Sequence, residues 1–330
     1  VASMSKTEKI GQMVMIGIQG TKVDDDSLYM LNQYHMGGVI LFDRNMESLE
    51  QVKQLTSDLQ AQSNEKVPLF IGIDEEGGDV VRMAEKLTPP PSQKEIGATG
   101  DIEQARTWAI KTAKSLKDMG INVNFAPVAD VGSNDKRSYS TDTNTVIDFV
   151  RAATKGYQQE NIIYSLKHFP GIGKGKVDSH IDSSSIDVAK EVLMTEDILP
   201  FKTIIDESDP NDYFILVSHL KYLALDEEYP ASLSSKIMTD LLRNELGYKG
   251  IIITDDMEMG AVANHNDFRS IGVNAVKAGA DIVLVCHEYK HQQEVYLGLL
   301  DAVNSGEISQ ERIDESVKRI IKVKLLHLYQ

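Results

Sequence analysis

Eight short apolar runs recur along the chain, and each occupies consecutive positions rather than alternate ones. Strands that are buried on both faces of a sheet show this pattern, because neither face has to carry polar side chains. The pattern therefore predicts eight buried, parallel strands, at residues 13–18, 38–42, 69–73, 123–128, 162–166, 213–218, 250–254 and 281–286.

Between the runs, apolar residues recur at three- and four-residue spacing, which is typical of amphipathic helices. The clearest cases are residues 48–62, 104–119, 234–246 and 312–328. The third of these begins with a serine suited to the N-cap and stops at Gly247, a residue type that often terminates helices. Strands and helices alternate over about 300 residues without a linker-like stretch. We therefore predict an α/β fold, with one (β/α)8 TIM-type barrel that spans residues 1–330 as a single domain.

The composition narrows the classes of function. Hydrophobic residues make up 42% of the 330 residues, which is ordinary for a globular protein and too many for a disordered one. The formal net charge of -16 argues against nucleic acid as a partner, because phosphate binding needs a basic face. Cys286 is the single cysteine, so no intramolecular disulfide can form, and its apolar surroundings predict a buried thiol.

The sequence leaves the location of the protein open. No apolar run reaches the length of about 18 residues that a membrane-spanning helix needs, so no transmembrane segment is predicted. The chain begins Val1-Ala2-Ser3 without a methionine, which we interpret as a processed or truncated terminus. A cytoplasmic bacterial enzyme and a secreted or lipid-anchored one both fit, and nothing in the sequence demands more than a monomer.

Polar residues follow most of the apolar runs. In a barrel these positions share the C-terminal rim, where active sites are built. Polar residues are also common at strand ends simply because strands end in water. This explanation accounts for one or two such groups, but it accounts poorly for seven. The groups are Asp43-Arg44-Asn45, Asp74-Glu75-Glu76, Asp130, Lys167-His168, Ser218-His219, Asp255-Asp256 and His287.

The segment from Lys167 to Asp187 carries alternate glycines from Gly171 to Gly175, which predicts a mobile loop rather than a strand or helix. Asp178-x-His180 lies within it. A carboxylate beside an imidazole fixes the tautomer of the ring and favours its protonated form, which creates a proton donor near neutral pH. A surface coincidence is the competing interpretation.

Two further strand ends carry candidate chemistry. Asp255 follows four apolar residues, so its carboxylate is expected at the mouth of the barrel. Asp74 ends another strand, and Gly77-Gly78 allow a tight turn that could return Arg82 toward the rim. An aspartate and an arginine in one pocket suit a ligand rich in hydroxyls, although a surface salt bridge explains the pair equally well.

An ordered set of motifs runs through nearly the whole chain. They are TEKIGQM (7–13), GGVILFDRN (37–45), IDEEGG (73–78), NVNFAPVADV (122–131), KHFPGIG (167–173), DSH (178–180), ILPF (198–201), SHL (218–220), ELGYKGIIITDDMEMGAV (245–262) and RIDESVKRIIKVK (312–324). In this order they resemble the family 3 glycoside hydrolases, and specifically their single-domain bacterial β-N-acetylglucosaminidase branch. No single motif is specific, but the ordered set is.

The resemblance implies a retaining enzyme that releases β-linked N-acetylglucosamine from a glycan, with peptidoglycan fragments as the expected source. Asp255 matches the family nucleophile, His180 matches the unusual histidine acid/base of this branch, and Asp178 matches the partner of that histidine. The positions that hold the hydroxyls of the terminal sugar are matched by Asp74, Arg82, Arg137, Lys167 and His168. Neither a cofactor nor a metal is expected.

The chain departs from the family at several positions. The family commonly has Gln at position 75 and Arg at position 79, where this chain has Glu75 and Asp79. The segment 130–142 around Arg137 is shorter and less typical. These differences concern the surroundings of the sugar rather than the catalytic positions.

Other functions compete with this interpretation. A neutral imidazole repels an anionic nucleophile less than a carboxylate would, so phosphate could replace water and make the enzyme a phosphorylase. A metal-dependent hydrolase could use the strand-end residues His168, His219, His287 and Asp255. A Schiff-base lyase could use Lys167. A non-catalytic sugar-binding protein on the same fold is the remaining alternative.

Overall fold

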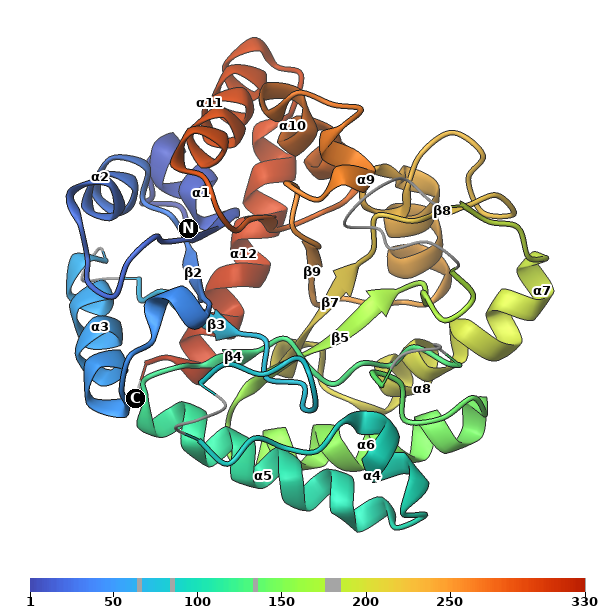
Figure 1. Cartoon of the computed structure of the whole chain (residues 1–330). Helices are drawn as coiled ribbons and strands as arrows, with labels where there is room; N and C mark the ends of the chain where they lie inside the picture. The colour runs from blue at the N-terminus through green and yellow to red at the C-terminus, as the bar shows by residue number, and fades with distance from the viewer. Residues whose placement is uncertain (64–66, 84–86, 133–135, 176–184, 330) are drawn as a thin grey trace.

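The computed structural model describes residues 1–63, 67–83, 87–132, 136–175 and 185–329 of the chain (Figure 1). Eight parallel strands lie in the order β10-β1-β2-β3-β4-β5-β7-β9. Their bounds are β1 Val14–Gly17, β2 Gly38–Leu41, β3 Phe70–Ile73, β4 Val123–Asn124, β5 Ile163–Phe169, β7 Tyr213–Val217, β9 Ile251–Thr254 and β10 Val283–Val285. All eight predicted strands are confirmed.

The two ends of this sheet meet and close it into a barrel. Ile253 at the end of β9 forms a parallel bridge with Ile282 beside β10. The Thr254 amide donates to the Ile282 carbonyl at 3.1 Å, and the Met257 amide donates to the Leu284 carbonyl at 2.9 Å. The predicted (β/α)8 TIM-type fold is therefore confirmed.

One strand is shorter than predicted. We expected β4 to span 123–128, but it covers only Val123–Asn124, and Val128 makes a separate bridge to Lys167. Pro127 has no amide hydrogen, so it cannot donate to the ladder at this point. The segment after β4 leaves the regular sheet as a result.

Helices surround the barrel (Figure 1). The four predicted helices are confirmed as α3 Leu49–Gln62, α5 Ile102–Asp118, η5 Lys236–Glu245 and α12 Gln310–His327. The others are α1 Lys6–Gln12, α2 Asp25–Tyr34, α4 Gln93–Ala98, α6 Thr143–Gln159, α7 Lys190–Val192, η2 Leu193–Asp197, α8 Leu199–Glu207, α9 Gly260–Ala263, α10 Phe268–Ala278 and α11 Tyr289–Ser305. Short 3-10 turns (η1 Asp43–Asn45, η3 Pro210–Asp212 and η4 Ala231–Leu233) and a two-stranded ribbon of β6 Ser185–Ile186 and β8 Lys221–Tyr222 complete the described elements.

The helix η5 shows how local signals set its ends. Its hydrogen bonds follow the wider π spacing, and Ser234 Oγ accepts the amide of Ile237 at 3.1 Å ahead of the helix. Gly247 follows the helix with a φ of 72°, a conformation that glycine adopts without a steric penalty. The predicted serine and glycine signals both act where the sequence places them.

The amino-terminal end of the barrel is held by buried ionic groups. Asp281, just before β10, is fully buried and contacts Arg319 at 2.9 Å and the side chain of Arg243. Lys324 of α12 is also fully buried, and its Nζ donates to Gln12 Oε1 at 2.7 Å and to the Gly37 carbonyl at 2.8 Å. These contacts fasten α12 across the strand starts, a face where barrels carry stability rather than chemistry.

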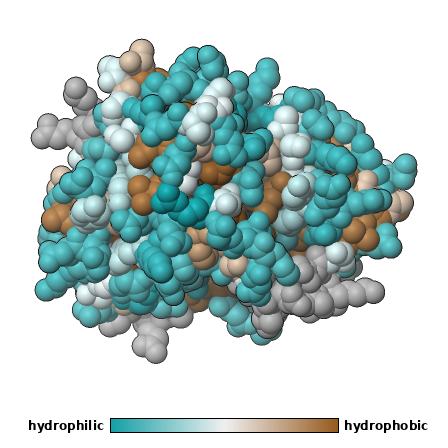
Figure 2. Space-filling view, turned by 90° about the horizontal axis from the view of Figure 1, so that it is seen from above, coloured by the Kyte–Doolittle hydropathy of each residue, from teal (hydrophilic) through white to brown (hydrophobic). Residues whose placement is uncertain are grey.

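The surface in Figure 2 is mostly hydrophilic, with hydrophobic residues in small patches between polar ones. Within the described ranges, no helix combines the length and the apolar character that crossing a membrane requires.

Candidate active site

A cavity of about 290 Å³ opens among the carboxyl ends of the strands, where the sequence places the polar groups. It unites six residues predicted from the sequence, namely Asp74, Arg82, Arg137, Lys167, His168 and Asp255. Phe42, Glu76, Asp256, Met259, Cys286 and His287 are among the other lining residues.

Asp255 follows β9 directly and is oriented by the backbone. Its amide donates to the Val217 carbonyl at 3.0 Å, and its Oδ1 accepts the amide of Asp256 at 2.8 Å. Burial raises the pKa of Asp255, but His219, His168 and the Asp256 amide outweigh burial, so the pKa lies below its ordinary value. The side chain is therefore an ionised carboxylate at neutral pH, as a nucleophile requires.

Asp256, next in sequence, has a different environment. Its Oδ1 accepts the amides of Cys286 at 3.1 Å and of Glu258 at 3.2 Å. Burial and the neighbouring carboxylates Glu258 and Asp255 raise the pKa of Asp256 to about 7. The two adjacent aspartates thus differ in charge below neutral pH, and Asp256 orients the turn through the amides that it accepts.

Asp74 and Arg82 meet in the cavity, although they lie on opposite sides of the Gly77-Gly78 turn. Arg82 Nη2 is 3.5 Å from Asp74 Oδ2, and the Arg82 amide donates to Glu75 Oε1 at 2.6 Å. The turn therefore returns Arg82 to the rim, which confirms the placement expected from the glycines.

Lys167 links two acidic residues of the β3 end. Its ammonium lies 2.6 Å from Glu76 Oε2 and 3.1 Å from Asp74 Oδ1. Burial lowers the pKa of Lys167, but Glu76 and Asp74 outweigh burial and raise it above the ordinary value. A protonated amine in ion pairs is a poor Schiff-base nucleophile, so the geometry disfavours the lyase alternative.

Glu76 is a functional candidate that the sequence argument left out of the sugar site. It is buried, and it also receives Arg137, whose Nε and Nη2 lie 3.0 and 2.7 Å from the two carboxylate oxygens. Burial raises the pKa of Glu76, but the positive charges of Lys167 and Arg137 outweigh burial and lower the pKa to about 2. Its membership of the strand-end group Asp74-Glu75-Glu76 is the feature of the sequence that could have assigned Glu76 to the site.

His168 is fixed by Asp130, a second residue that the sequence argument did not assign to the site. The ring Nδ1 is 2.8 Å from Asp130 Oδ2, and the His168 amide donates to Asp130 Oδ1 at 3.2 Å. The ring is thus oriented by Asp130 through Nδ1, while Nε2 lies 3.3 Å from Arg137 Nη2.

Asp178 and His180, the predicted acid/base pair, lie outside the residues that the structure describes. The segment that leads toward them is fixed at its base. Lys174 Nζ lies 2.6 Å from Asp197 Oδ2 and 2.8 Å from Glu196 Oε2. A Cβ at Gly173 would lie only 1.7 Å from the Val131 carbonyl oxygen, so this close approach requires glycine.

The histidines that a metal-dependent hydrolase would use are committed to separate partners. His168 pairs with Asp130, whereas His219 Nε2 lies 2.7 Å from the Asp256 carbonyl oxygen and its Nδ1 lies 2.7 Å from Ser232 Oγ. These contacts point the rings at different groups, which does not favour a shared metal.

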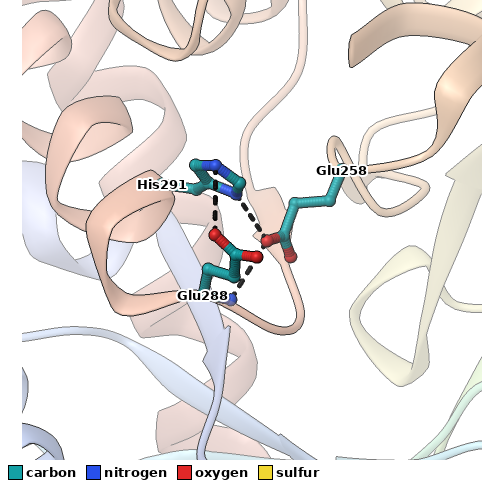
Figure 3. Close-up of side chains that lie close together, drawn as sticks. All are labelled: Glu258, Glu288 and His291. Carbon is teal, nitrogen blue, oxygen red and sulfur yellow. Dashed lines mark hydrogen bonds and ion pairs between the residues drawn. The ribbon is translucent and has the colours of Figure 1, made fainter. Parts of the chain in front are cut away.

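A different cluster with metal-ligating side chains lies where the turn after β9 meets the start of α11 (Figure 3). Among the described residues it is the one group of at least three such side chains with ligand atoms within 4.8 Å of one another, and it comprises Glu258, Glu288 and His291. His291 lies between the two carboxylates, with Nδ1 2.7 Å from Glu258 and Nε2 3.3 Å from Glu288. The carboxylates face opposite ring nitrogens, with a hydrogen bond to Glu258 and an ion pair to Glu288, so the three groups do not converge on one point.

The sequence profile described as "Glycosyl hydrolase family 3 N terminal domain" matches residues 6–323. The chain belongs to glycosyl hydrolase family 3. The family resemblance drawn from the motifs is thus confirmed, and the match extends over almost the whole barrel.

Individual relatives agree with this assignment. Beta-hexosaminidase A of Pseudoalteromonas piscicida is 35% identical over 326 residues, which cover 89% of this chain and 54% of that protein. Beta-hexosaminidase of Nitrosomonas eutropha is 30% identical over 318 residues, covering 92% and 90%. A solved family 3 beta-N-acetylglucosaminidase from Paenibacillus sp. str. FPU-7 superposes with a TM-score of 0.94 at 37% identity, covering 98% of this chain and 62% of that one. The chain thus spans little more than half of the first relative, but nearly all of the second.

Proposed function

We propose that this chain is a retaining exo-β-N-acetylglucosaminidase, which releases terminal β-linked N-acetylglucosamine through a glycosyl-enzyme on Asp255. The observation that carries the proposal is an ionised Asp255 facing a cavity whose other side groups Asp74, Lys167 and His168. The cavity of about 290 Å³ lies at the lower end of the usual range for small-ligand sites, which suits one sugar ring. The names of the relatives support N-acetylglucosamine as that sugar.

The charged side chains of the cavity include both acceptors and donors for the hydroxyls of a sugar. Asp74 accepts hydroxyl hydrogens, while Lys167 and Arg82 donate to hydroxyl oxygens, and charge-assisted bonds of this kind are strong. His168 lines the same cavity and adds a further polar group to it. Because Glu76 already pairs with Lys167 and Arg137, these cations hold their positions before the sugar arrives.

In the first step, a carboxylate oxygen of Asp255 attacks the anomeric carbon while His180, as imidazolium, gives its proton to the leaving oxygen. The carbon–oxygen bond to the aglycone breaks, and an ester to Asp255 forms. In the second step, neutral His180 takes a proton from water, and the hydroxide oxygen replaces Asp255 at the anomeric carbon. Asp178 orients His180 and stabilises its protonated form in this scheme.

For the natural substrate we propose glycan fragments of peptidoglycan. The resemblance to the bacterial branch supports this choice. The aglycone is recognised by loops, which vary among family members and are not fixed by the barrel itself.

The test compares nitrophenyl β-N-acetylglucosaminide with nitrophenyl β-glucoside, each with and without phosphate, and follows the anomer of the first-formed sugar by proton NMR. We expect preference for the N-acetyl sugar and initial release of the β-anomer. An α-anomer would reject the retaining mechanism. A rate that depends on phosphate, with a sugar phosphate as product, would show that the enzyme is a phosphorylase. Turnover of neither substrate would reject the proposed activity.

A further inference from the structure

The cavity has a second wall, which the proposed mechanism does not use. The sugar-binding candidate Asp74 directly follows β3 and Lys167 lies on β5, whereas β10 flanks β9 on its other side. His287 follows β10 and lines the cavity together with Phe42 from the end of β2. Asp255 therefore has a group of polar side chains on one side and this less polar wall on the other.

Two carboxylates tie this wall to the turn that carries Asp255. They accept three successive amides: Asp256 Oδ1 accepts from Cys286 at 3.1 Å, and Glu258 Oε1 and Oε2 accept from His287 at 2.6 Å and from Glu288 at 3.0 Å. Glu258 also contacts His291 of α11, as Figure 3 shows. The Asp255 turn and the β10 end therefore form one hydrogen-bonded unit.

Arg44 fixes the ring of His287. Its Nε donates to the Ile18 carbonyl at 2.8 Å, and its Nη2 donates to the Cys286 carbonyl at 2.7 Å. Its Nη1 lies 2.7 Å from His287 Nδ1. A guanidinium has only donors, so Nδ1 must accept, and the ring proton is assigned to Nε2.

His287 lines the cavity and carries its remaining ring N–H on Nε2. The imidazole is half-exposed, and Nε2 is 3.7 Å from Asp256 Oδ2, which is too long for a hydrogen bond. The ring also packs against Phe42 with 5.2 Å between ring centroids. Burial lowers the pKa of His287, and Arg44 lowers it too, so the ring is neutral at neutral pH. The side chain offers a ligand one uncharged donor in a fixed place.

We propose that His287 is a specificity-determining residue of the active site, which donates its Nε2–H to an oxygen of the bound sugar, and that Glu258 is the residue that positions it. This inference rests on the proposed function, since it assumes a sugar in the cavity. It assigns the recognition of the sugar to both walls, with ionic groups on one side and a neutral donor on the other.

The kinetic experiment uses the aryl glycoside that the wild-type enzyme cleaves best. His287→Ala and His287→Phe should each lower kcat/KM about tenfold, the scale of one lost hydrogen bond. The phenylalanine variant keeps a ring against Phe42 but has no donor, so it separates hydrogen bonding from packing. Unchanged kcat/KM in the phenylalanine variant would overturn the inference.

Glu258→Ala should lower kcat/KM in the same direction, and adding it to His287→Ala should cause little further loss, because positioning acts through the ring. Effects that multiply would show that Glu258 does not act through His287. Glu258→Gln keeps an acceptor oxygen and should recover part of the activity, and it serves as the second variant if Glu258→Ala fails to fold.

Asp226 offers a matched control. It is buried, and it accepts the amides of Glu228 at 2.9 Å and Tyr229 at 3.2 Å and the Ser234 hydroxyl at 2.6 Å. Asp226→Asn should lower the melting temperature but leave kcat/KM of the folded enzyme unchanged. If Asp226→Asn also lowered kcat/KM, the lower kcat/KM of Glu258→Ala would be explained by lost stability alone.

Histidine nitrogen NMR separates this inference from the proposed function. In the free protein, His287 should show the neutral tautomer with the proton on Nε2, whatever the enzyme hydrolyses. Adding N-acetylglucosamine should shift the Nε2 resonance. An active wild-type enzyme with an unmoved resonance would overturn the inference alone. An inactive enzyme whose resonance moves with no tested monosaccharide would overturn both.

Discussion

Two aspartates at opposite ends of the barrel, the buried Asp281 and the partly buried Asp255, allow a comparison between a structural carboxylate and the proposed nucleophile. Asp281 lies just before β10, and Asp255 lies just after β9. Nearby positive groups outweigh burial at both, so both carboxylates have a lowered pKa. Both are therefore ionised at neutral pH, and charge alone does not distinguish them.

Their partners do distinguish them. Asp281 receives Arg319 at 2.9 Å, the Ser316 hydroxyl at 2.6 Å and the Ile252 amide at 2.9 Å, in addition to Arg243. Asp255 accepts the amide of Asp256 and otherwise faces the cavity. A carboxylate saturated by hydrogen bonds holds structure together, whereas one that faces open space can attack a substrate.

The largest expected effect is on the catalytic side of this comparison. Asp255→Ala should lower turnover by about four orders of magnitude or more, because the nucleophile is removed. The melting temperature should change little, since few contacts are lost. Release of nitrophenol and thermal denaturation followed by circular dichroism measure the two effects. A variant that retained a near-normal rate would remove Asp255 from the mechanism.

Asp281→Asn should show the opposite pattern. It leaves the partly buried arginines around the buried Asp281 without their charged partner, and breaking a buried ion pair costs about 3–5 kcal/mol of unfolding free energy. The folded fraction should keep its kcat. Urea denaturation and activity at a temperature below the transition measure this. A loss of kcat without a loss of stability would contradict the division between the two ends.

Glu75 provides a prediction about pH. Burial and the nearby carboxylates Asp43 and Asp74 raise its pKa to about 7, although the Arg82 amide lowers it. The folded state therefore binds the proton of the Glu75 carboxyl more tightly than the unfolded state does. The free energy of unfolding that this proton contributes is lost as pH rises from about 4.5 to about 7. Glu75→Gln, the residue common in the family, should remove this loss and stabilise the protein above pH 7 by up to about 3 kcal/mol. Denaturation curves at pH 5 and pH 8 test it, and an equal slope with pH in both proteins would contradict it.

The smallest effect is expected where a carboxylate pairs in water. Glu207 is 43% exposed and lies 2.8 Å from Arg151 on the outer surface. Glu207→Gln should change the free energy of unfolding by less than about 1 kcal/mol, because solvent screens exposed pairs. A cost as large as that of Asp281→Asn would show that burial is not what separates these sites.

The fold followed from the sequence because the barrel strands are buried on both faces, and their apolar runs mark them clearly. The strand-end positions of Asp74, Lys167, His168 and Asp255 followed from the same pattern. The strand bounds were less predictable, as β4 shows, because Pro127 interrupts a run that is apolar enough to continue.

The rest of the site depends on contacts that no short motif reveals. Glu76 and Asp130 belong to the site through ion pairs and hydrogen bonds to residues 91 and 38 positions away in sequence, Lys167 and His168. Glu258 reaches across to the His287 amide in the same way. The predicted pair Asp178 and His180, and the single-domain organisation, stay predictions.

The central claim is that Asp255 forms the covalent intermediate. It is tested most directly by incubating the enzyme with a 5-fluoro analogue of an N-acetylglucosaminyl fluoride, which slows the release of the glycosyl-enzyme, and by mass spectrometry of its proteolytic peptides. We predict one added sugar, on Asp255. A sugar on Asp256 or on another residue, or an enzyme that cleaves the substrate without ever carrying the label, would contradict the account.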